Sequence, residues 1–215
     1  MRKGISLGIF FLATSLVFAE KPDRIGLGFL GSFAPLEGNY QTVTPLDATT
    51  NYTYTYETFG ARVFFDFIYG EASAAYKAPI TQLNTSVTAS GTSTSQSIPF
   101  LMSVIDIRLV GKYPFHLGFL TLFPLIGVAG DFCLSGKLNN ASFTNDDKGN
   151  FSPWWIVAGL GGDFTITQDV FVRIELTCAY DVTSEFATSY YDAVGPYSNS
   201  SGWEVEIAAG IGFTI

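Results

Sequence analysis

The stretch Gly202-Trp-Glu-Val-Glu-Ile-Ala-Ala-Gly-Ile-Gly-Phe-Thr-Ile215 alternates between apolar residues and polar or small ones. Every second residue from Trp203 to Ile215 is apolar, and the residues between them are Glu, Ala, Gly and Thr. A period of two predicts a β-strand with one apolar face. The apolar stripe is longer than an average strand of about five or six residues. It therefore favours the closing strand of a transmembrane β-barrel, with the stripe facing lipid.

Seven further segments alternate in the same way, so the sequence predicts eight strands. The segments span about 24–34, 57–68, 71–79, 98–110, 119–133, 153–166, 170–182 and 202–215. Pro124 interrupts the fifth segment, and we expect a bulge or an irregular step there because proline cannot donate to a strand ladder. The expected fold class is all-β, an eight-stranded antiparallel transmembrane β-barrel with an up-and-down meander.

The connections between these segments alternate in length. Long connections, rich in Ser, Thr, Asn, Gly and Tyr, cover 35–56, 80–97, 134–152 and 183–201. Short connections cover 69–70, 112–118 and 167–169. Outer-membrane barrels have short turns on the periplasmic side and long loops outside, so the alternation predicts a bacterial outer-membrane location.

Residues 1–19 have the composition of a secretory signal peptide. A basic start, Met1-Arg2-Lys3, precedes an apolar run that ends at Ala19, where we expect cleavage. The run is shorter than the roughly 20 residues that a membrane-spanning helix needs. The sequence therefore predicts a signal peptide at 1–19 and one outer-membrane barrel domain at 20–215.

The charge balance is acidic and the charged fraction is low. The chain has 11 basic and 19 acidic residues and a net charge of −8, which argues against nucleic acid as a partner. Only 14% of the residues are charged, whereas 47% are hydrophobic and 16% are aromatic. The hydrophobic residues are spread over the predicted strands, as a β-barrel in lipid requires.

Aromatic residues cluster near both ends of the predicted strands, where amphipathic rings prefer the headgroup regions of a bilayer. Those near the short turns are Phe67, Tyr69, Tyr113, Phe115, Phe119, Phe171 and Phe213. Those near the long loops are Tyr52, Tyr54, Tyr56, Phe151, Trp154 and Trp203. We expect the two groups to form aromatic girdles.

If the apolar faces meet lipid, the opposite faces line the lumen and carry a network of charges. The candidate site residues are Arg62, Asp66, Asp106, Arg108, Asp163, Arg173, Glu175, Glu204 and Glu206. Eight strands enclose only enough room for side chains, so these charges must pair or form hydrogen bonds. Three positive charges face six negative ones, so we expect incomplete pairing. Glu204 and Glu206 lie toward the long-loop ends of the predicted strands, whereas Arg108 and Arg173 lie near the short-turn ends. We therefore expect the two glutamates to be hydrated.

The lumen supports two interpretations. Paired charges that alternate with glycine are typical of a polar plug that fills a small barrel and sets strand register. Alternatively, the same residues form a narrow, cation-preferring path. A third arrangement, a soluble lipocalin-like binder, would place the apolar faces inside and the polar faces in water.

Enzymatic motifs are sparse. His116 is the sole histidine and falls in a short connection, whereas histidine is the usual general base and metal ligand. We expect no enzymatic activity, no cofactor and no metal site. Cys133 and Cys178 are too few for a disulfide-stapled module, and a disulfide between them stays open.

The chain resembles the small bacterial outer-membrane barrels of the OmpX/OmpW/OmpA-barrel type. The resemblance rests on the signal peptide, the eight alternating segments, the terminal Gly210-Ile-Gly-Phe-Thr-Ile215, and the segments Lys112-Tyr-Pro-Phe115 and Leu120-Thr-Leu-Phe-Pro-Leu-Ile-Gly127. The family usually ends in Phe, whereas this chain ends in Ile215 with Phe213 two residues earlier.

The resemblance implies a non-enzymatic integral membrane protein with a polar, filled lumen. Its long surface-exposed loops would serve surface contact or envelope integrity. The alternative is an OmpW-like narrow channel for small hydrophobic or ionic solutes. The implied partners are outer-membrane lipid, the barrel assembly machinery through the C-terminal strand, and an extracellular ligand of the loops.

Overall fold

The computed structural model describes residues 24–41, 49–79, 83–89, 92–98, 100–138, 141–145, 148, 152–183 and 197–215. The predicted signal peptide, residues 1–19, lies outside these residues. The strands are β1 (Arg24–Gln41), β2 (Thr49–Phe67), β3 (Gly70–Pro79), β4 (Leu83–Ala89), β5 (Thr92–Ile98), β6 (Phe100–Lys112), β7 (Phe115–Leu117), β8 (Leu120–Leu138), β9 (Ala141–Ser142), β10 (Trp154–Thr165), β11 (Val170–Asp181) and β12 (Tyr197–Thr214).

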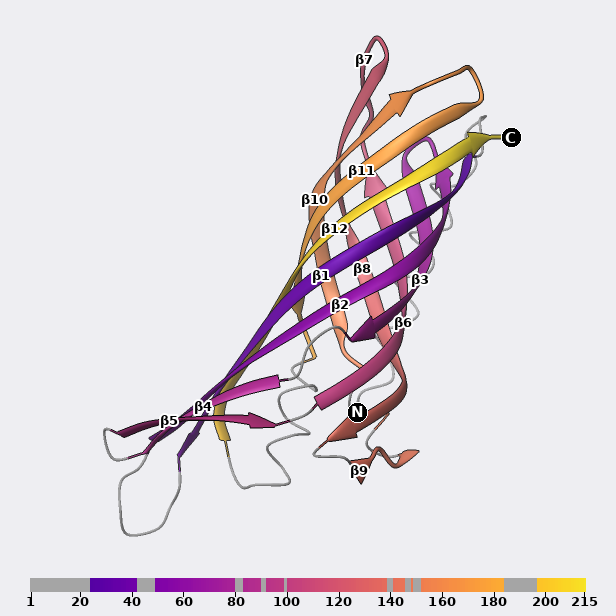
Figure 1. Ribbon diagram of the computed structural model, residues 1–215. Helices are drawn as coiled ribbons and strands as arrows, with labels where there is room; N and C mark the ends of the chain where they lie inside the picture. Colours follow the sequence, from indigo (N-terminus) through magenta and orange to yellow (C-terminus); the bar gives the residue numbers. More distant parts are fainter. Residues whose placement is uncertain are drawn as a thin grey trace, which may run out of the picture.

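Eight of these strands close into an antiparallel ring. The order around the ring is β1-β2-β3-β6-β8-β10-β11-β12, and β12 pairs with β1. Successive long strands are neighbours, so the described part of the chain forms an up-and-down meander (Figure 1). The predicted fold, an all-β, eight-stranded antiparallel barrel, is confirmed. No helix in the described segments is long and apolar enough to cross a membrane.

Strands β1, β2 and β12 extend past their predicted ends. The β1–β2 ladder continues from Pro35 paired with Thr55 to Gln41 paired with Thr49. The prediction of a loop at 35–56 is therefore wrong for most of that range. Residues 52–56 alternate Tyr and Thr, which favour strands, but residues 49–56 lack the apolar face on which the sequence prediction relied.

The other predicted long loops also contain paired strands. Within 80–97, β4 pairs with β5 as a separate two-stranded hairpin. Strand β8 continues to Leu138, and β12 begins at Tyr197. The long connections are therefore partly ordered extensions of the barrel wall. In Figure 1 β4, β5 and β9 lie at one end of the barrel, and β7 and the C-terminus lie at the other, the short-turn end.

The expected irregularity at Pro124 is absent from the described β8. The ladder with β10 runs without a register shift through Leu160 paired with Pro124. The Pro124 carbonyl accepts a hydrogen bond from the Tyr113 N–H, just past the end of β6. A residue in an antiparallel strand directs its N–H and C=O to the same neighbour, so the missing donor falls where the β6 ladder ends. The register shift between β6 and β8 occurs instead at Ser103/Val104.

The two faces of the wall are opposite in character. Large apolar side chains on all eight ring strands point outward and are exposed, as shown by Leu27 at 61%, Ile126 at 66% and Leu160 at 66%. Every second residue points inward, and these residues include most of the charged side chains of the barrel. This is the reverse of a soluble lipocalin-like binder, which would carry its apolar face inside.

The ring closes along a long seam. Strand β1 pairs with β12 from Arg24 with Thr214 to Tyr40 with Tyr197. The β3–β6 ladder is much shorter and runs from Gly70 with Gly111 to Lys77 with Val104. The wall of the barrel is therefore unequally paired around its circumference.

Candidate functional site

All nine predicted lumen residues lie inside the barrel. Their exposed fractions are 4% or less for Arg62, Asp66, Asp106, Arg108, Asp163, Arg173, Glu175, Glu204 and Glu206. The interior also buries charged residues absent from the prediction: Glu71, Lys77, Lys112, Asp131 and Asp181. Most of these charges gather in two clusters, one above the other along the barrel axis.

The end cluster lies at the short-turn end and comprises Arg24, Asp66, Glu71, Lys112, Asp163 and Arg173. Arg173 holds it together. Its Nε lies 2.7 Å from Asp163 Oδ1 and its Nη2 lies 2.8 Å from Asp163 Oδ2, a bidentate pair. The same guanidinium donates to Glu71 and Asp66. All three guanidinium nitrogens therefore have carboxylate partners.

Three phenylalanine rings surround the Arg173 guanidinium, whose central carbon lies 4.5 Å from the ring centroid of Phe64, 5.0 Å from that of Phe123 and 5.3 Å from that of Phe171. A cation within about 6 Å of a ring face is attracted to it. The guanidinium and the three rings therefore lie at one level of the lumen.

Each ring lies over a glycine that is its direct cross-strand partner. The pairs are Gly26 with Phe64, Gly161 with Phe123 and Gly212 with Phe171. A Cβ on any of these glycines would overlap the ring. The prediction of Phe171 as a girdle residue is wrong, because its position on β11 is in phase with Arg173 and its side chain is 3% exposed. Glycine at position 212 makes the room for the ring.

The structure describes the side chains of some of the other predicted girdle residues but not of all. Phe67 is half-buried. The exposed girdle residues are Tyr69, Tyr113, Phe115, Phe119, Phe213, Trp154 and Trp203. The side chains of Tyr52, Tyr54, Tyr56 and Phe151 lie outside the described part of the structure.

The central cluster comprises Arg62, Lys77, Asp106, Arg108, Asp131, Glu204 and Glu206. Glu206 accepts hydrogen bonds from Arg62 and Arg108. Glu204 accepts one from Lys77 at 2.8 Å. The expectation that Glu204 and Glu206 are hydrated is therefore wrong.

Strand stagger explains this error. Glu206 pairs along the ladder with Ser32, and Ser32 pairs with Thr58 of β2. The Glu206 carboxylate nevertheless meets Arg62, four positions further along β2. Tilted strands in a barrel bring residues of different ladder positions to one level along the axis. Distance along a strand therefore does not measure distance inside the lumen.

Two acidic side chains of the central cluster oppose each other directly. Asp106 and Asp131 are cross-strand partners on β6 and β8, and both point inward. Neither Asp106 oxygen receives a hydrogen bond, and the Lys77 Nζ lies 3.5 Å from Asp106 and 3.9 Å from Asp131. Asp131 is held by the Trp155 Nε1–H at 3.0 Å. Four carboxylates therefore meet three cations in this cluster, and the Nε atoms of Arg62 and Arg108 also lack hydrogen-bond partners.

Glu175 connects the two clusters. Its carboxylate lies 3.1 Å from Arg62 in the central cluster and 3.7 Å from Arg173 in the end cluster. The clusters thus form one continuous network along the lumen, from Asp131 to Arg24.

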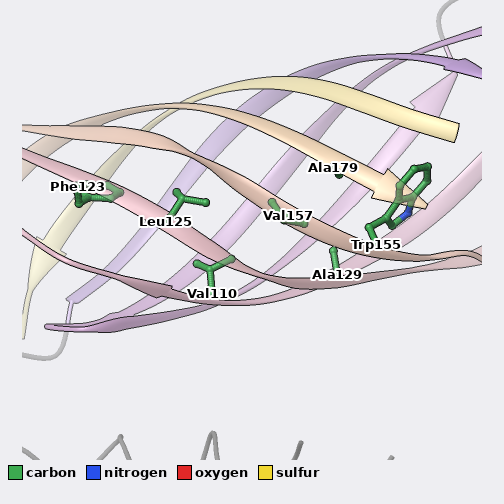
Figure 2. Close-up of a cluster of buried hydrophobic side chains, with 7 residues drawn as sticks. All are labelled: Val110, Phe123, Leu125, Ala129, Trp155, Val157 and Ala179. Carbon is green, nitrogen blue, oxygen red and sulfur yellow. The ribbon is translucent and has the colours of Figure 1, made fainter. Parts of the chain in front are cut away.

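Part of the lumen is lined by apolar side chains. The side chains of Val110, Phe123, Leu125, Ala129, Trp155, Val157 and Ala179 form a buried cluster on β6, β8, β10 and β11. Figure 2 shows these side chains along neighbouring strands. The same strands also carry charged lumen residues, among them Arg108 on β6 and Asp131 on β8. We call the apolar cluster the apolar wall.

Groups that catalyse reactions or bind metals are few among the described residues. His116 lies on the exposed β7 hairpin, where its Nδ1 is 3.1 Å from Thr121 Oγ1. Within these residues no group of three or more His, Cys, Asp or Glu side chains has the arrangement of a metal site. Cys133 and Cys178 are free thiols.

The residues missing from the sequence prediction had weak signals. Glu71 and Lys77 lie on β3, whose outward face is mostly alanine and therefore marks the strand poorly. Asp131 lies on the strand that Pro124 made hard to assign, and Lys112 was assigned to a turn. Counting every second residue along these strands would have placed the side chains of Glu71, Lys77, Lys112 and Asp131 inside.

Comparison with protein-family models gives no match, and comparison with curated proteins gives none either. Solved structures do match. Outer membrane protein OprG from Pseudomonas aeruginosa is 13% identical, with 91% of this chain and 97% of that chain covered and a TM-score of 0.46.

Two further matches are similar in extent. The N-terminal β-barrel domain of Pseudomonas aeruginosa OprF is 11% identical, with coverage of 88% and 99% and a TM-score of 0.44. Neisserial surface protein A is 8% identical, with coverage of 87% and 97% and a TM-score of 0.44. The three are described as an outer membrane protein, a β-barrel domain and a surface protein. The architecture that the resemblance implied, an eight-stranded antiparallel barrel, is the one that this chain forms.

Proposed function

We propose that this chain is an integral protein of the bacterial outer membrane. In this proposal residues 1–19 are removed as a signal peptide and residues 20–215 form the barrel. The belt of exposed apolar side chains around the eight ring strands supports it, because such a surface is unfavourable in water and suits lipid. The antiparallel ring leaves no open sheet edge in the wall, which a bilayer requires.

The proposed role is non-enzymatic, with a closed lumen and long loops that serve surface contact or envelope integrity. The observation that carries the closed lumen is the arrangement around Arg173, where one guanidinium bonds three carboxylates among three phenylalanine rings. Opening this level would separate buried charges from their partners, which costs several kcal/mol per ion. The C-terminal strand β12 would be read by the barrel assembly machinery.

Planar-bilayer recording of the refolded mature protein tests the closed lumen. The expected result is the absence of steady single-channel steps across a wide voltage range. Heat-modifiable migration on a gel would establish beforehand that the sample is a folded barrel. Steady cation-selective steps that Glu204→Gln and Glu206→Gln reduce would contradict the closed lumen.

The second candidate function is an OmpW-like narrow channel for small hydrophobic or ionic solutes. The apolar wall favours it, because buried apolar side chains that line part of the lumen could contact a hydrophobic solute. Vesicle uptake of a small hydrophobic dye separates the two candidates. Uptake above that of protein-free vesicles, abolished by a bulky Ala129→Phe change in the apolar wall, would favour the channel.

A further inference from the structure

A cavity of about 440 Å³ opens at the short-turn end, just outside the end cluster. Its lining includes Arg24, Lys112, Asp66, Asp163, Thr165 and Thr167. The β7 hairpin and the turn at 166–169 form part of its walls. We call this cavity the vestibule. Small-ligand sites commonly have volumes of about 300–1,000 Å³, so the vestibule has room for a small molecule.

In the floor of the vestibule, Arg24 is more exposed than the two carboxylates with which it pairs. The Arg24 side chain is 21% exposed, whereas those of Asp66 and Asp163 are 1% and 2% exposed. Both ion pairs of Arg24 use Nη1, at 3.3 Å from Asp66 and 2.8 Å from Asp163. One nitrogen of Arg24 therefore lies close to both carboxylates.

Aromatic rings hold the two cations of the floor. The Arg24 guanidinium carbon lies 3.5 Å from the centroid of the Phe171 ring, and the Lys112 Nζ lies 4.6 Å from that of Phe123. Stacking fixes the plane of a guanidinium and leaves its edge available for hydrogen bonds. The cations of the floor are therefore positioned before any ligand arrives.

Hydroxyl groups on the walls add further donors. Thr167 Oγ1 accepts the N–H groups of Asp169 at 3.3 Å and Val170 at 3.1 Å. Because its oxygen accepts both bonds, its own proton is left to donate. Thr165 lines the same cavity and is exposed.

We propose that the vestibule binds a small oxyanion, a carboxylate or phosphate group, through the partly exposed Arg24 guanidinium and the hydroxyls of Thr165 and Thr167. A solute that enters from the short-turn end meets this guanidinium and these hydroxyls, and charge-assisted hydrogen bonds to an oxyanion are the strong ones. The oxyanion could belong to a soluble molecule or to a phospholipid headgroup.

Inorganic phosphate, titrated into the isotope-labelled barrel in a maltoside micelle, tests the site by nuclear magnetic resonance. The expected result is a saturable shift of the Thr165, Thr167 and Asp169 amide signals and of the Arg24 Nε signal. Arg24→Gln should weaken binding at least about tenfold, because a hydrogen bond to a charged group is worth about 1.5–3 kcal/mol. Lys137→Gln, an exposed cation on β8, should leave it unchanged.

A second variant keeps the end cluster intact. Thr165→Val removes a wall hydroxyl and should weaken phosphate binding roughly threefold, the effect of one neutral hydrogen bond. Phosphatidylglycerol added to the micelle separates the sources. Saturation by phosphate indicates a soluble ligand, and saturation by the lipid alone indicates a headgroup.

The proposal is overturned if neither probe gives a saturable shift, or if Arg24→Gln binds as the unchanged protein does. Heat-modifiable migration of each variant shows that the barrel has folded. The measurement uses a folded barrel in detergent, so its failure would leave the proposed outer-membrane role and the closed lumen standing.

Discussion

The end cluster and the central cluster of the lumen differ in how they satisfy buried carboxylates. In the end cluster Arg173 reaches Asp66, Glu71 and Asp163 with all three of its nitrogens. In the central cluster Lys77 lies within 4.0 Å of four carboxylates but forms one short hydrogen bond, to Glu204. Both oxygens of Asp106 remain without a hydrogen bond.

Arg173 and Lys77 differ in their donors, although the central cluster also contains Arg62 and Arg108. A guanidinium presents five N–H donors in a fixed, planar fork, whereas an ammonium is a compact charge with three donors. Packing also differs, because three rings surround Arg173. We infer that the end cluster fixes the barrel interior and that the central cluster carries residual repulsion.

Arg173→Ala should have the largest effect. It leaves Asp66, Glu71 and Asp163 without their common partner, and breaking a buried ion pair costs about 3–5 kcal/mol. Urea unfolding in detergent, followed by tryptophan fluorescence, measures the loss. Lys137→Ala, at an exposed position on β8, is the control and should change stability by no more than about 0.5 kcal/mol. A loss below about 1 kcal/mol for Arg173→Ala would contradict the assignment of Arg173 as the centre of the end cluster.

A matched pair of isosteric changes compares the clusters directly. Asp163→Asn removes a charged, bidentate acceptor of Arg173 and should cost about 1.5–3 kcal/mol. Asp131→Asn removes one of two facing carboxylates and should raise the unfolding free energy by up to about 1 kcal/mol, because like charges directly opposite destabilise a sheet. The same unfolding assay reads both variants. Equal losses would show that the two clusters do not differ.

Glycine substitutions on β1 test the ring packing of the end cluster. Gly26→Ala places a methyl group against the Phe64 ring, and overpacking of this kind costs about 1–3 kcal/mol. Gly31→Ala is the control on the same strand, because its Cβ would meet no atom closer than 3.8 Å. Adding Phe64→Leu to Gly26→Ala should recover part of the loss. Equal effects of the two alanine changes would show that ring packing is not the cause.

The alternation of apolar and polar residues predicted the ring strands and the faces of the lumen residues. The face on which a strand residue lies follows from local alternation alone. The predicted lumen residues, from Arg62 on β2 to Glu206 on β12, all lie on the inner face that the alternation predicted. Strand ends were predicted less well, because residues 49–56 pair through Thr and Tyr without an apolar stripe. The pairing of charges inside the lumen was predicted least well.

Charge pairing depends on the stagger of the barrel, which is a property of the closed ring and not of any one strand. Sequence position placed Glu206 far from Arg108, but the two side chains form an ion pair at 3.0 Å. The count of three positive and six negative charges also omitted Lys77 and Lys112. Once these lysines are included, acidic residues still outnumber basic ones inside the lumen.

The strand pairs of the wall differ in the length of their hydrogen-bonded ladders, and under lateral stress the shortest ladder is expected to separate first. The junction of the first and last strands runs from Arg24 with Thr214 to Tyr40 with Tyr197, whereas β3 and β6 hold together only from Gly70 with Gly111 to Lys77 with Val104. A side exit into the bilayer would therefore form between β3 and β6. The junction that joins the two ends of the chain is among the hardest to unzip.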